Sequence, residues 1–216
     1  MASLGRASVL LASGTLVSRI LGFVRAAVLV AAIGAMNEGA NAFAIANQLP
    51  NNIYTIIASG ILSAVLVPQI VRANGHADGG KAYINKLFTI ALVVLLLATV
   101  AAMLLAPLLI QLYTSEWTEA QRALGTSMAY WCLPQIFFYG LYALLGEVLN
   151  AKKVFGPFTW APIINNVIAL IGLGAFIWIF GLYNKETAAI TDWTPERIAL
   201  LGGLTTLGVA AQALIL

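Results

Sequence analysis

Long apolar runs recur along this 216-residue chain, and they constrain its fold more than any other feature. The clearest is the stretch FTIALVVLLLATVAAMLLAPLLI at residues 88–110, and only 9% of all residues are charged. A helix needs about 20 apolar residues to cross roughly 30 Å of hydrocarbon. Because every backbone polar group must be satisfied inside the bilayer, repeated long spans of this kind form helices. The alternating pattern of a membrane β-barrel is absent. The sequence therefore predicts an all-α, polytopic membrane protein.

Six spans can be placed along the chain, and we interpret residues 1–216 as one transmembrane lobe. The first span begins like a secretory signal, but its apolar pattern continues past a signal's usual length and shows no small-residue cleavage site. We therefore interpret it as a retained helix. Turn signals at Asn74-Gly75 and Gly156-Pro157 separate later spans. The spans are predicted at about 7–34, 39–72, 87–113, 119–150, 158–183 and 197–216.

Basic residues collect on one side of these spans. With a cytoplasmic N-terminus, the cytoplasmic segments hold six Lys or Arg residues against one acid, and the external segments hold three against six. This distribution follows the positive-inside rule. We predict a multi-pass protein of the cytoplasmic membrane with its N-terminus in the cytoplasm. The net charge of +3 is then an orientation signal, and nucleic acid is not an expected partner.

Three charged residues fall within the spans: Arg19, Arg25 and Glu147. At a rise of about 1.5 Å per residue, Arg19 lies roughly 18 Å past Ala7, near the bilayer midplane, and Arg25 roughly 27 Å past it. A central arginine costs about 2.5–3.5 kcal/mol on insertion scales, so it needs a wet cavity or a partner. Alternatively, Arg25 reaches the outer interface with its long side chain. Glu147 is either an interfacial residue or a partner for Lys152.

The two arginines favour a phosphate-bearing ligand. Arginine stays charged in a low dielectric and binds phosphate oxygens through two parallel hydrogen bonds. A spacing of six residues sets Arg19 and Arg25 about 120° apart on an ideal helix. Joint binding then requires a bend, which Gly22 would permit, or a ligand that reaches around the helix. Gly14, Ser18 and Gly22 also form a row of small residues, which is typical of close helix packing.

The second span carries a polar stripe within about 40° of one direction on an ideal helix. Such a stripe faces a water-filled cavity or other helices, because contact with lipid would leave its polar groups unpaired. We predict cavity-lining roles for four members, and hydrogen bonding between helices is the alternative. The four are Asn41, Gln48, Asn52 and Ser59.

Three segments resemble the MurJ (MviN) lipid II flippases of the MOP transporter superfamily. SRILGFVRAAVLVAAIGA (residues 18–35) is similar to their first helix. NAFAIANQLPNNIYTIIASGILSAVLVPQIV (residues 41–71) resembles their second helix. GEVLNAKKVFGPFTWAPIINN (residues 146–166) resembles the passage between their fourth and fifth helices.

This resemblance implies a transporter that moves a lipid-linked peptidoglycan precursor across the bacterial cytoplasmic membrane by alternating access. Its expected substrate is of the undecaprenyl diphosphate type, with membrane lipids and the peptidoglycan-synthesis machinery as partners and no cofactor. The family's essential first-helix arginines correspond to Arg19 and Arg25, which would hold the diphosphate. The chain departs from the usual pattern at Asn41, Tyr54 and Ser59, where the family has acidic, basic and acidic residues. The family has fourteen helices, so we expect a fragment that corresponds to the first lobe.

Other functional classes have less support in the sequence. An enzyme is not expected, because His76 is the only histidine and no metal cluster, nucleophile–base pair or phosphate-binding loop stands out. The lone Cys132 reads as a small core residue. Another exporter of the same superfamily, for drugs or polysaccharide lipids, and a non-transporting membrane scaffold remain as alternatives.

Overall fold

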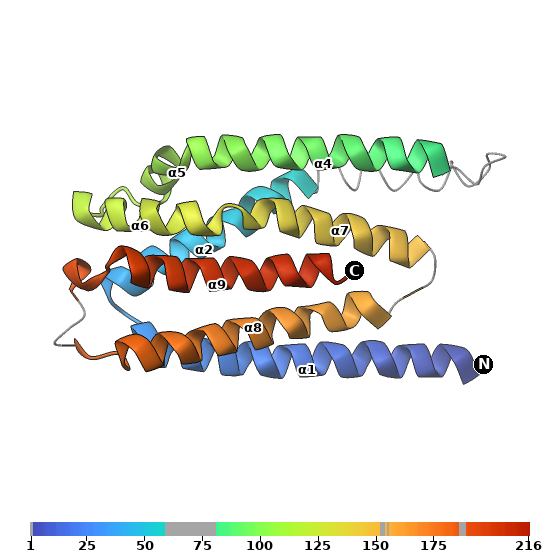
Figure 1. Ribbon diagram of the computed structural model, residues 1–216, viewed down its shortest axis with the longest axis horizontal. Coiled ribbons are helices and arrows are strands. Elements are labelled where there is room, and N and C mark those ends of the chain that lie inside the picture. The colour runs from blue at the N-terminus through green and yellow to red at the C-terminus, as the bar shows by residue number, and fades with distance from the viewer. Residues whose placement is uncertain (1, 59–80, 152–153, 155, 186–188) are drawn as a thin grey trace.

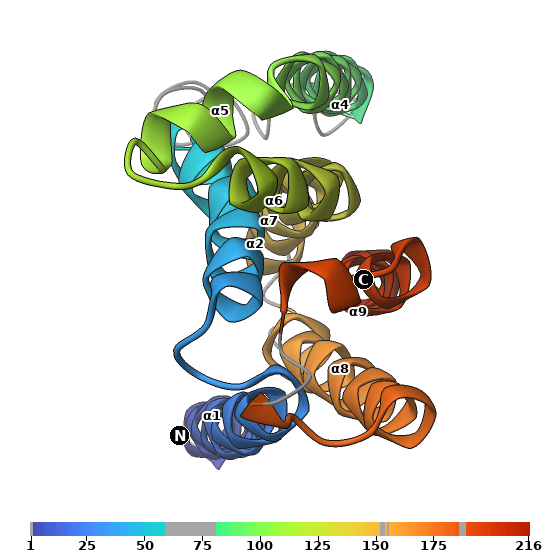
Figure 2. The same ribbon diagram turned by 90° about the vertical axis from the view of Figure 1, so that its left-hand side faces the viewer.

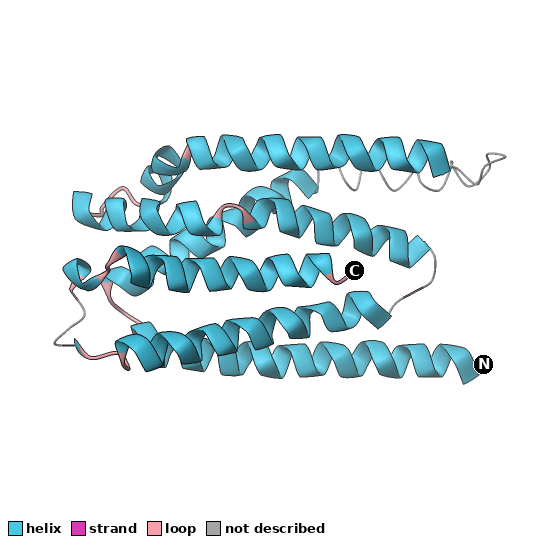
Figure 3. Cartoon of the chain, viewed as in Figure 1, coloured by secondary structure: helices cyan, strands magenta, loops and turns pink. Residues whose placement is uncertain are grey.

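Hydrocarbon-length helices make up the computed structural model, which describes residues 2–58, 81–151, 154, 156–185 and 189–216 (Figures 1 and 3). Five helical stretches in these ranges are long and apolar enough to cross a membrane, namely 11–33, 85–104, 119–150, 156–180 and 195–214. The prediction of an all-α, multi-pass protein is confirmed. The helices are α1 (Ala2–Ile33), α2 (Glu38–Ile57), α4 (Lys81–Leu104), α5 (Ala106–Tyr113), α6 (Glu119–Cys132), α7 (Gln135–Ala151), α8 (Gly156–Phe180) and α9 (Pro195–Leu214), with the 3-10 turn η3 (Ile190–Asp192) before α9.

Two predicted spans differ from the structure, and prolines account for both differences. The span at 87–113 is divided at Leu105, so that α5 starts as a new helix with Pro107 in its first turn. The span at 119–150 is divided between α6 and α7, with Pro134 at the break. Proline has no backbone N–H and its ring collides with the carbonyl four residues earlier, so it interrupts a helix. The second predicted span, 39–72, is described only as far as Ala58, and its described part is not among the five.

The side chain of one asparagine, Asn37, makes hydrogen bonds to both the end of α1 and the start of α2. Gly34 ends α1 with a positive φ of 81°, a conformation that glycine adopts without strain. The Asn37 side chain donates to the Ile33 carbonyl at 2.7 Å and accepts from the Ala40 amide at 2.8 Å. It therefore satisfies one free carbonyl at the end of α1 and one free amide at the start of α2.

Each helix packs mainly on one or two others, and α1 and α2 do not pack along each other. In the described part of the structure, α1 packs along α8, α8 along α9, and α9 against α6 and α7, whereas α2 packs mainly on α6 and α7. Figure 2 shows the result from the end that holds the α1–α2 turn: α1 and α2 lie toward the left of the view, and α8 and α9 lie to their right. The two helices that carry the candidate site residues are therefore joined by the turn and held mainly by different neighbours.

The predicted row of small residues on α1 does hold another helix. A Cβ atom added at Gly14 would lie 2.8 Å from the Thr159 Cγ2 atom of α8. One turn further along α1, the Ser18 carbonyl accepts from the Asn166 Nδ2 atom of α8 at 3.0 Å. Gly22 also faces Asn166. The small residues thus bring α8 against one side of α1.

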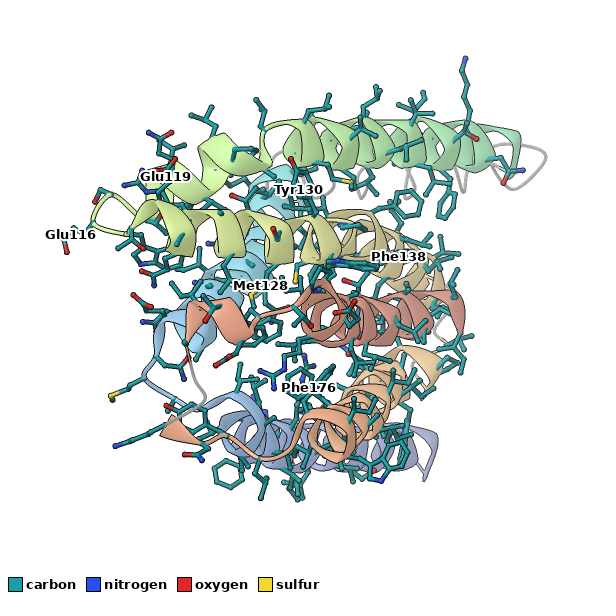
Figure 4. All side chains as sticks on the ribbon, turned by 60° about the vertical axis from the view of Figure 1, so that its left-hand side comes forward. Glu116, Glu119, Met128, Tyr130, Phe138 and Phe176 are labelled. Atoms are coloured by element: carbon teal, nitrogen blue, oxygen red, sulfur yellow. The ribbon has the colours of Figure 1, made fainter. Side chains whose placement is uncertain are left out.

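The outer faces of the helices are apolar. Phe23 of α1 is 78% exposed and Trp178 of α8 is 86% exposed, as expected for side chains that face lipid. The protein core lies where α2, α6 and α9 meet, and Leu49, Met128 and Ile136 are buried there. Figure 4 shows Met128 and Phe176 pointing into the bundle.

Replacement of Gly208 by alanine tests the close contact between α8 and α9. The added Cβ atom would lie 2.5 Å from the Asn165 Oδ1 atom and 3.1 Å from the Asn165 carbonyl oxygen, so the two helices must move apart. We expect Gly208→Ala to lower stability by about 1–3 kcal/mol, measured as a lower thermal unfolding temperature in detergent. The control is Gly203→Ala on the same helix, whose Cβ atom would make an ordinary contact at 3.4 Å with Trp131. An equal effect of the two substitutions would contradict this account.

Candidate functional site

Arg19 lies on the exposed side of α1, at the edge of a groove of about 480 Å³ between α1, α7 and α8. One wall of the groove is the stacked pair of Tyr142 and Phe158, whose ring centroids are 4.7 Å apart. The Tyr142 hydroxyl donates to the Phe158 carbonyl at 2.8 Å and ties α7 to α8. The described lining residues include no Asp or Glu; they are Leu11, Thr15, Ser18, Arg19, Tyr142, Asn150, Phe158, Thr159 and Pro162.

Arg25 is half-buried and points into a different pocket, between α1, α2, α8 and α9. Its guanidinium also interacts electrostatically with the Tyr139 hydroxyl of α7. Apart from Thr205, the other described residues that line this pocket are apolar, and no Asp or Glu is among them: Leu29, Phe43, Ala169, Gly172, Leu173, Leu200, Leu201 and Leu204.

The two arginines do not meet in one pocket. Six residues of α-helix separate them by about 9 Å along the axis, and α1 continues as a helix through Gly22. Arg19 borders the groove toward α7 and α8, whereas Arg25 borders the pocket toward α2 and α9. A ligand must therefore extend along α1, or move along it, to contact both.

A buried amide links the helices around Arg25. Gln135 is fully buried at the start of α7, directly after the break at Pro134. Its Nε2 atom donates to the Thr206 Oγ1 atom of α9 at 3.0 Å and to the Asn47 Oδ1 atom of α2 at 3.4 Å. Its Oε1 atom accepts from the Tyr139 hydroxyl at 3.2 Å. One side chain thus joins α2, α7 and α9 and holds the Tyr139 hydroxyl.

An aromatic pair extends this polar region along α2 and α7. The rings of Tyr54 and Tyr139 lie 5.8 Å apart between centroids, tilted by 38°. Glu147, two turns further along α7, is exposed and interacts electrostatically with Tyr54. Of the two interpretations of Glu147, the one that pairs it with Lys152 lies outside the described residues.

The predicted polar residues of α2 have different environments in the structure. Asn41 and Gln48 are exposed on the side of α2 away from its buried contacts with α6. Asn52 is half-buried, and its Nδ2 atom donates to the Tyr113 hydroxyl of α5 at 3.4 Å. Ser59 lies outside the described residues. The structure therefore gives Asn52 a contact between helices, and it leaves Asn41 and Gln48 accessible.

The residues of this polar region between α2 and α7 were not among the sequence candidates. Asn47 and Tyr54 are seven residues apart, so they share a face of α2 that lies about 120° from the predicted stripe. Gln135 follows a proline within an apolar span, which is a detectable signal because an amide there requires partners. Tyr139 gives no such signal, since tyrosine is common in membrane helices.

The described part of the chain contains no metal-binding group and no accessible thiol. No group of three His, Cys, Asp or Glu residues there is placed to hold a metal ion. Cys132 is free and fully buried among the residues of the core, as the sequence predicted. His76 lies outside the described residues.

Comparison with known protein families shows to which family this chain belongs. Residues 29–216 match the family described as "Lipid II flippase MurJ". The chain belongs to the MurJ family. It is therefore a multi-pass membrane protein of a transporter family, and not of an enzyme family. The match begins after Arg19 and Arg25, so it does not test the prediction that these two arginines bind the substrate.

Curated members of the MurJ family are similar to most of the chain. A probable lipid II flippase MurJ of Rickettsia prowazekii (strain Madrid E) is 30% identical over 196 residues, which are 88% of this chain and 37% of that protein. The corresponding protein of Rhizobium tropici is 30% identical over 213 residues, which are 96% and 39% of the two chains. The chain thus spans about two fifths of the length of these relatives.

A solved MurJ structure shares the fold. The chain aligns with a lipid II flippase MurJ in an inward closed conformation with a TM-score of 0.68 and 20% sequence identity. The alignment covers 95% of this chain and 40% of that structure. At this identity the comparison concerns the fold alone, and it agrees with the helical arrangement in Figure 1.

Replacement of Gln135 by leucine tests the amide link between α2, α7 and α9. The substitution removes two donated hydrogen bonds and one accepted hydrogen bond, and it leaves the Asn47 and Tyr139 polar atoms without this partner. We expect a loss of about 1–3 kcal/mol of stability, measured by thermal unfolding in detergent. Gln111→Leu, at an exposed position of α5, is the matched control and should unfold with the wild-type chain. Equal unfolding temperatures for all three proteins would contradict the proposed link.

Proposed function

We propose that this chain is a lobe of a lipid II flippase of the bacterial cytoplasmic membrane. Its substrate is a lipid-linked peptidoglycan precursor of the undecaprenyl diphosphate type, moved from the inner to the outer leaflet by alternating access. Membership of the MurJ family supports this proposal, as do the names of the curated relatives. The five membrane-length helices supply the scaffold.

The environment of Arg25 carries the proposal. An arginine stays protonated even when partly desolvated, and no carboxylate is among the described residues that line its pocket. The positive charge of Arg25 therefore favours binding of an anionic ligand, which would supply the negative charge that the pocket lacks. A diphosphate suits the position, because guanidinium and phosphate form parallel, charge-assisted hydrogen bonds.

Arg19 takes part at a different depth. With the N-terminus in the cytoplasm, Arg19 is about 9 Å closer to the cytoplasmic side than Arg25. The groove beside it offers hydroxyl and amide groups from Thr15, Ser18 and Asn150. We infer that the headgroup contacts Arg19 first and Arg25 deeper in the membrane, so that both arginines are required although they border separate openings.

The acidic loop residues support the proposed orientation. Glu116 and Glu119 lie at the end of the bundle that also holds the α1–α2 turn (Figure 4). A cytoplasmic N-terminus puts this end outside the cell, where acidic residues are compatible with the positive-inside rule. The precursor would then enter from the opposite end, which Arg19 approaches more closely.

Complementation tests the assignment of both arginines. The natural gene that carries this chain is expressed in bacteria depleted of their own lipid II flippase, beside Arg19→Ala and Arg25→Ala variants. We expect the natural gene to restore growth and each variant to fail at equal membrane levels, because each removes a charge that holds the diphosphate. Lys185→Ala, at an exposed cation of the α8–α9 connection, is the control and should restore growth fully.

The contrary results discriminate between alternatives. Growth with either arginine variant would exclude that arginine from an essential contact with the substrate. Failure of the natural gene at normal expression would favour another lipid or drug as substrate, or a scaffold role.

A further inference from the structure

A further groove lies at the surface of the structure, where α9 passes the break between α6 and α7. Its volume is about 460 Å³, which falls within the roughly 300–1,000 Å³ that is usual for ligand sites. None of its described lining residues is charged or belongs to α1 or α2, so the groove is separate from the openings beside Arg19 and Arg25. The described lining residues are Tyr130, Trp131, Pro134, Gly203, Thr206, Leu207 and Ala210.

Glycine residues of α9 leave the floor of this groove open. At Gly202 an added Cβ atom would lie 2.6 Å from the Trp131 Cβ atom, so the α9 backbone lies against α6 there. At Gly203 an added Cβ atom would lie 3.4 Å from the Trp131 ring, which is an ordinary contact. The indole ring therefore stands beside Gly203 as one wall of the groove. Trp131 is 46% exposed and Tyr130 is 44% exposed, so this wall is accessible from outside the protein.

The hydroxyl group of Thr206 in the groove is already bonded within the protein. Its Oγ1 atom donates its only proton to the Trp131 carbonyl at 2.6 Å, and it accepts from the Gln135 Nε2 atom at 3.0 Å. The Trp131 carbonyl lies in the last turn of α6, where carbonyl groups have no partner within the helix. The contact thus satisfies a free backbone group and leaves no hydroxyl proton of Thr206 for a ligand.

The groove lies near the middle of two membrane-length helical stretches. Trp131 is twelve residues after Glu119, the start of α6, and Leu207 is twelve residues after Pro195, the start of α9. At a rise of about 1.5 Å per residue, both lie about 18 Å along their helices. This depth is close to the middle of roughly 30 Å of hydrocarbon, where a bilayer holds lipid chains and no headgroups.

We propose that the groove between α6 and α9 binds one acyl chain of a membrane phospholipid. The chain displaces no hydrogen bond, because the described lining has no charged side chain and the Thr206 hydroxyl is bonded internally. It packs on the Trp131 ring and fills the space beside Gly203, which gives it more dispersion contacts than an open helix face offers. It also covers the hydrogen bond that fastens α9 to the end of α6. The proposal does not depend on the proposed function.

Other occupants fit the groove less well. A bound water molecule needs several polar partners, and the Thr206 proton is already used. Close packing of a further transmembrane helix needs direct access to small residues, and the rings of Tyr130 and Trp131 stand beside Gly203. The isoprenoid chain of a substrate held at either arginine would start from openings that share no described lining residue with this groove.

Fluorescence quenching by a brominated lipid tests the occupant. The chain is reconstituted with phosphatidylcholine that is brominated on one acyl chain, and is then washed in a short-chain detergent until the bound lipid no longer decreases. The emission of Trp131 is the difference between the wild-type chain and Trp131→Phe, and the emission of Trp178, which is 86% exposed on α8, is obtained in the same way. We expect the retained lipid to quench Trp131 about threefold more strongly than Trp178, because burial of roughly one more methylene group tightens binding by that factor.

Substitutions on the floor of the groove supply matched variants. Gly203→Leu and Ala210→Leu each place a larger side chain where the acyl chain is expected, and each should lower the quenching of Trp131 to that of Trp178. Gly203→Ala is the control, since its Cβ atom makes only an ordinary contact with the Trp131 ring, and it should keep the wild-type quenching. A wild-type unfolding temperature in detergent shows that a variant retains its fold.

Four contrary results would overturn the proposal. Equal quenching of Trp131 and Trp178 in the wild-type chain would show that the retained lipid is ordinary boundary lipid. Quenching of Trp131 by aqueous iodide would show a groove filled with water. Protection of Trp131 from both quenchers would show that protein covers the groove, such as a second copy of the chain. Recovery of the Trp131 emission on addition of undecaprenyl phosphate, but not of unbrominated phosphatidylcholine, would assign the groove to an isoprenoid chain.

Discussion

The arrangement around α1 depends on the cost of a guanidinium group in hydrocarbon. Arg25 keeps its charge and needs polar surroundings, so α1 cannot be surrounded by lipid and apolar helices on all sides. Its small residues hold α8 closely on one side through Gly14 and the contact of Ser18 with Asn166. On other sides of α1, Arg25 borders the pocket toward α2 and α9, and Arg19 borders the groove toward α7.

Hydropathy predicts the spans of such a protein well, because the bilayer fixes their length and excludes backbone without hydrogen bonds. The breaks inside the spans are harder to predict. Pro50 and Pro162 lie within continuous helices, whereas Pro134 separates α6 from α7. The proline alone does not decide the outcome. At Pro134 the next residue, Gln135, makes hydrogen bonds to α2 and α9, and only the tertiary structure supplies those partners.

The candidate site shows the same division between local and tertiary information. Arg19 and Arg25 could be singled out from the sequence because a charge in an apolar span demands an explanation. On α2, the sequence predicts the cavity-lining face from the positions of polar residues on an ideal helix. This prediction selects Asn41 and Gln48. The face toward α7 instead carries Asn47 and Tyr54, whose partners Gln135 and Tyr139 lie more than 80 residues later in the sequence.

Neutral side-chain groups join the helices, and this affects how the arginines can act. Amides and hydroxyls make the contacts between Gln135 and Thr206, between Asn165 and Gln212, and between Asn166 and Ser18. Such bonds contribute roughly 0.6–2 kcal/mol each inside a membrane. A buried ion pair that used Arg25 would cost about 3–5 kcal/mol to break, and an incoming diphosphate would have to meet that cost. A lobe joined by neutral hydrogen bonds can keep its shape while its arginine charge stays available to the proposed diphosphate.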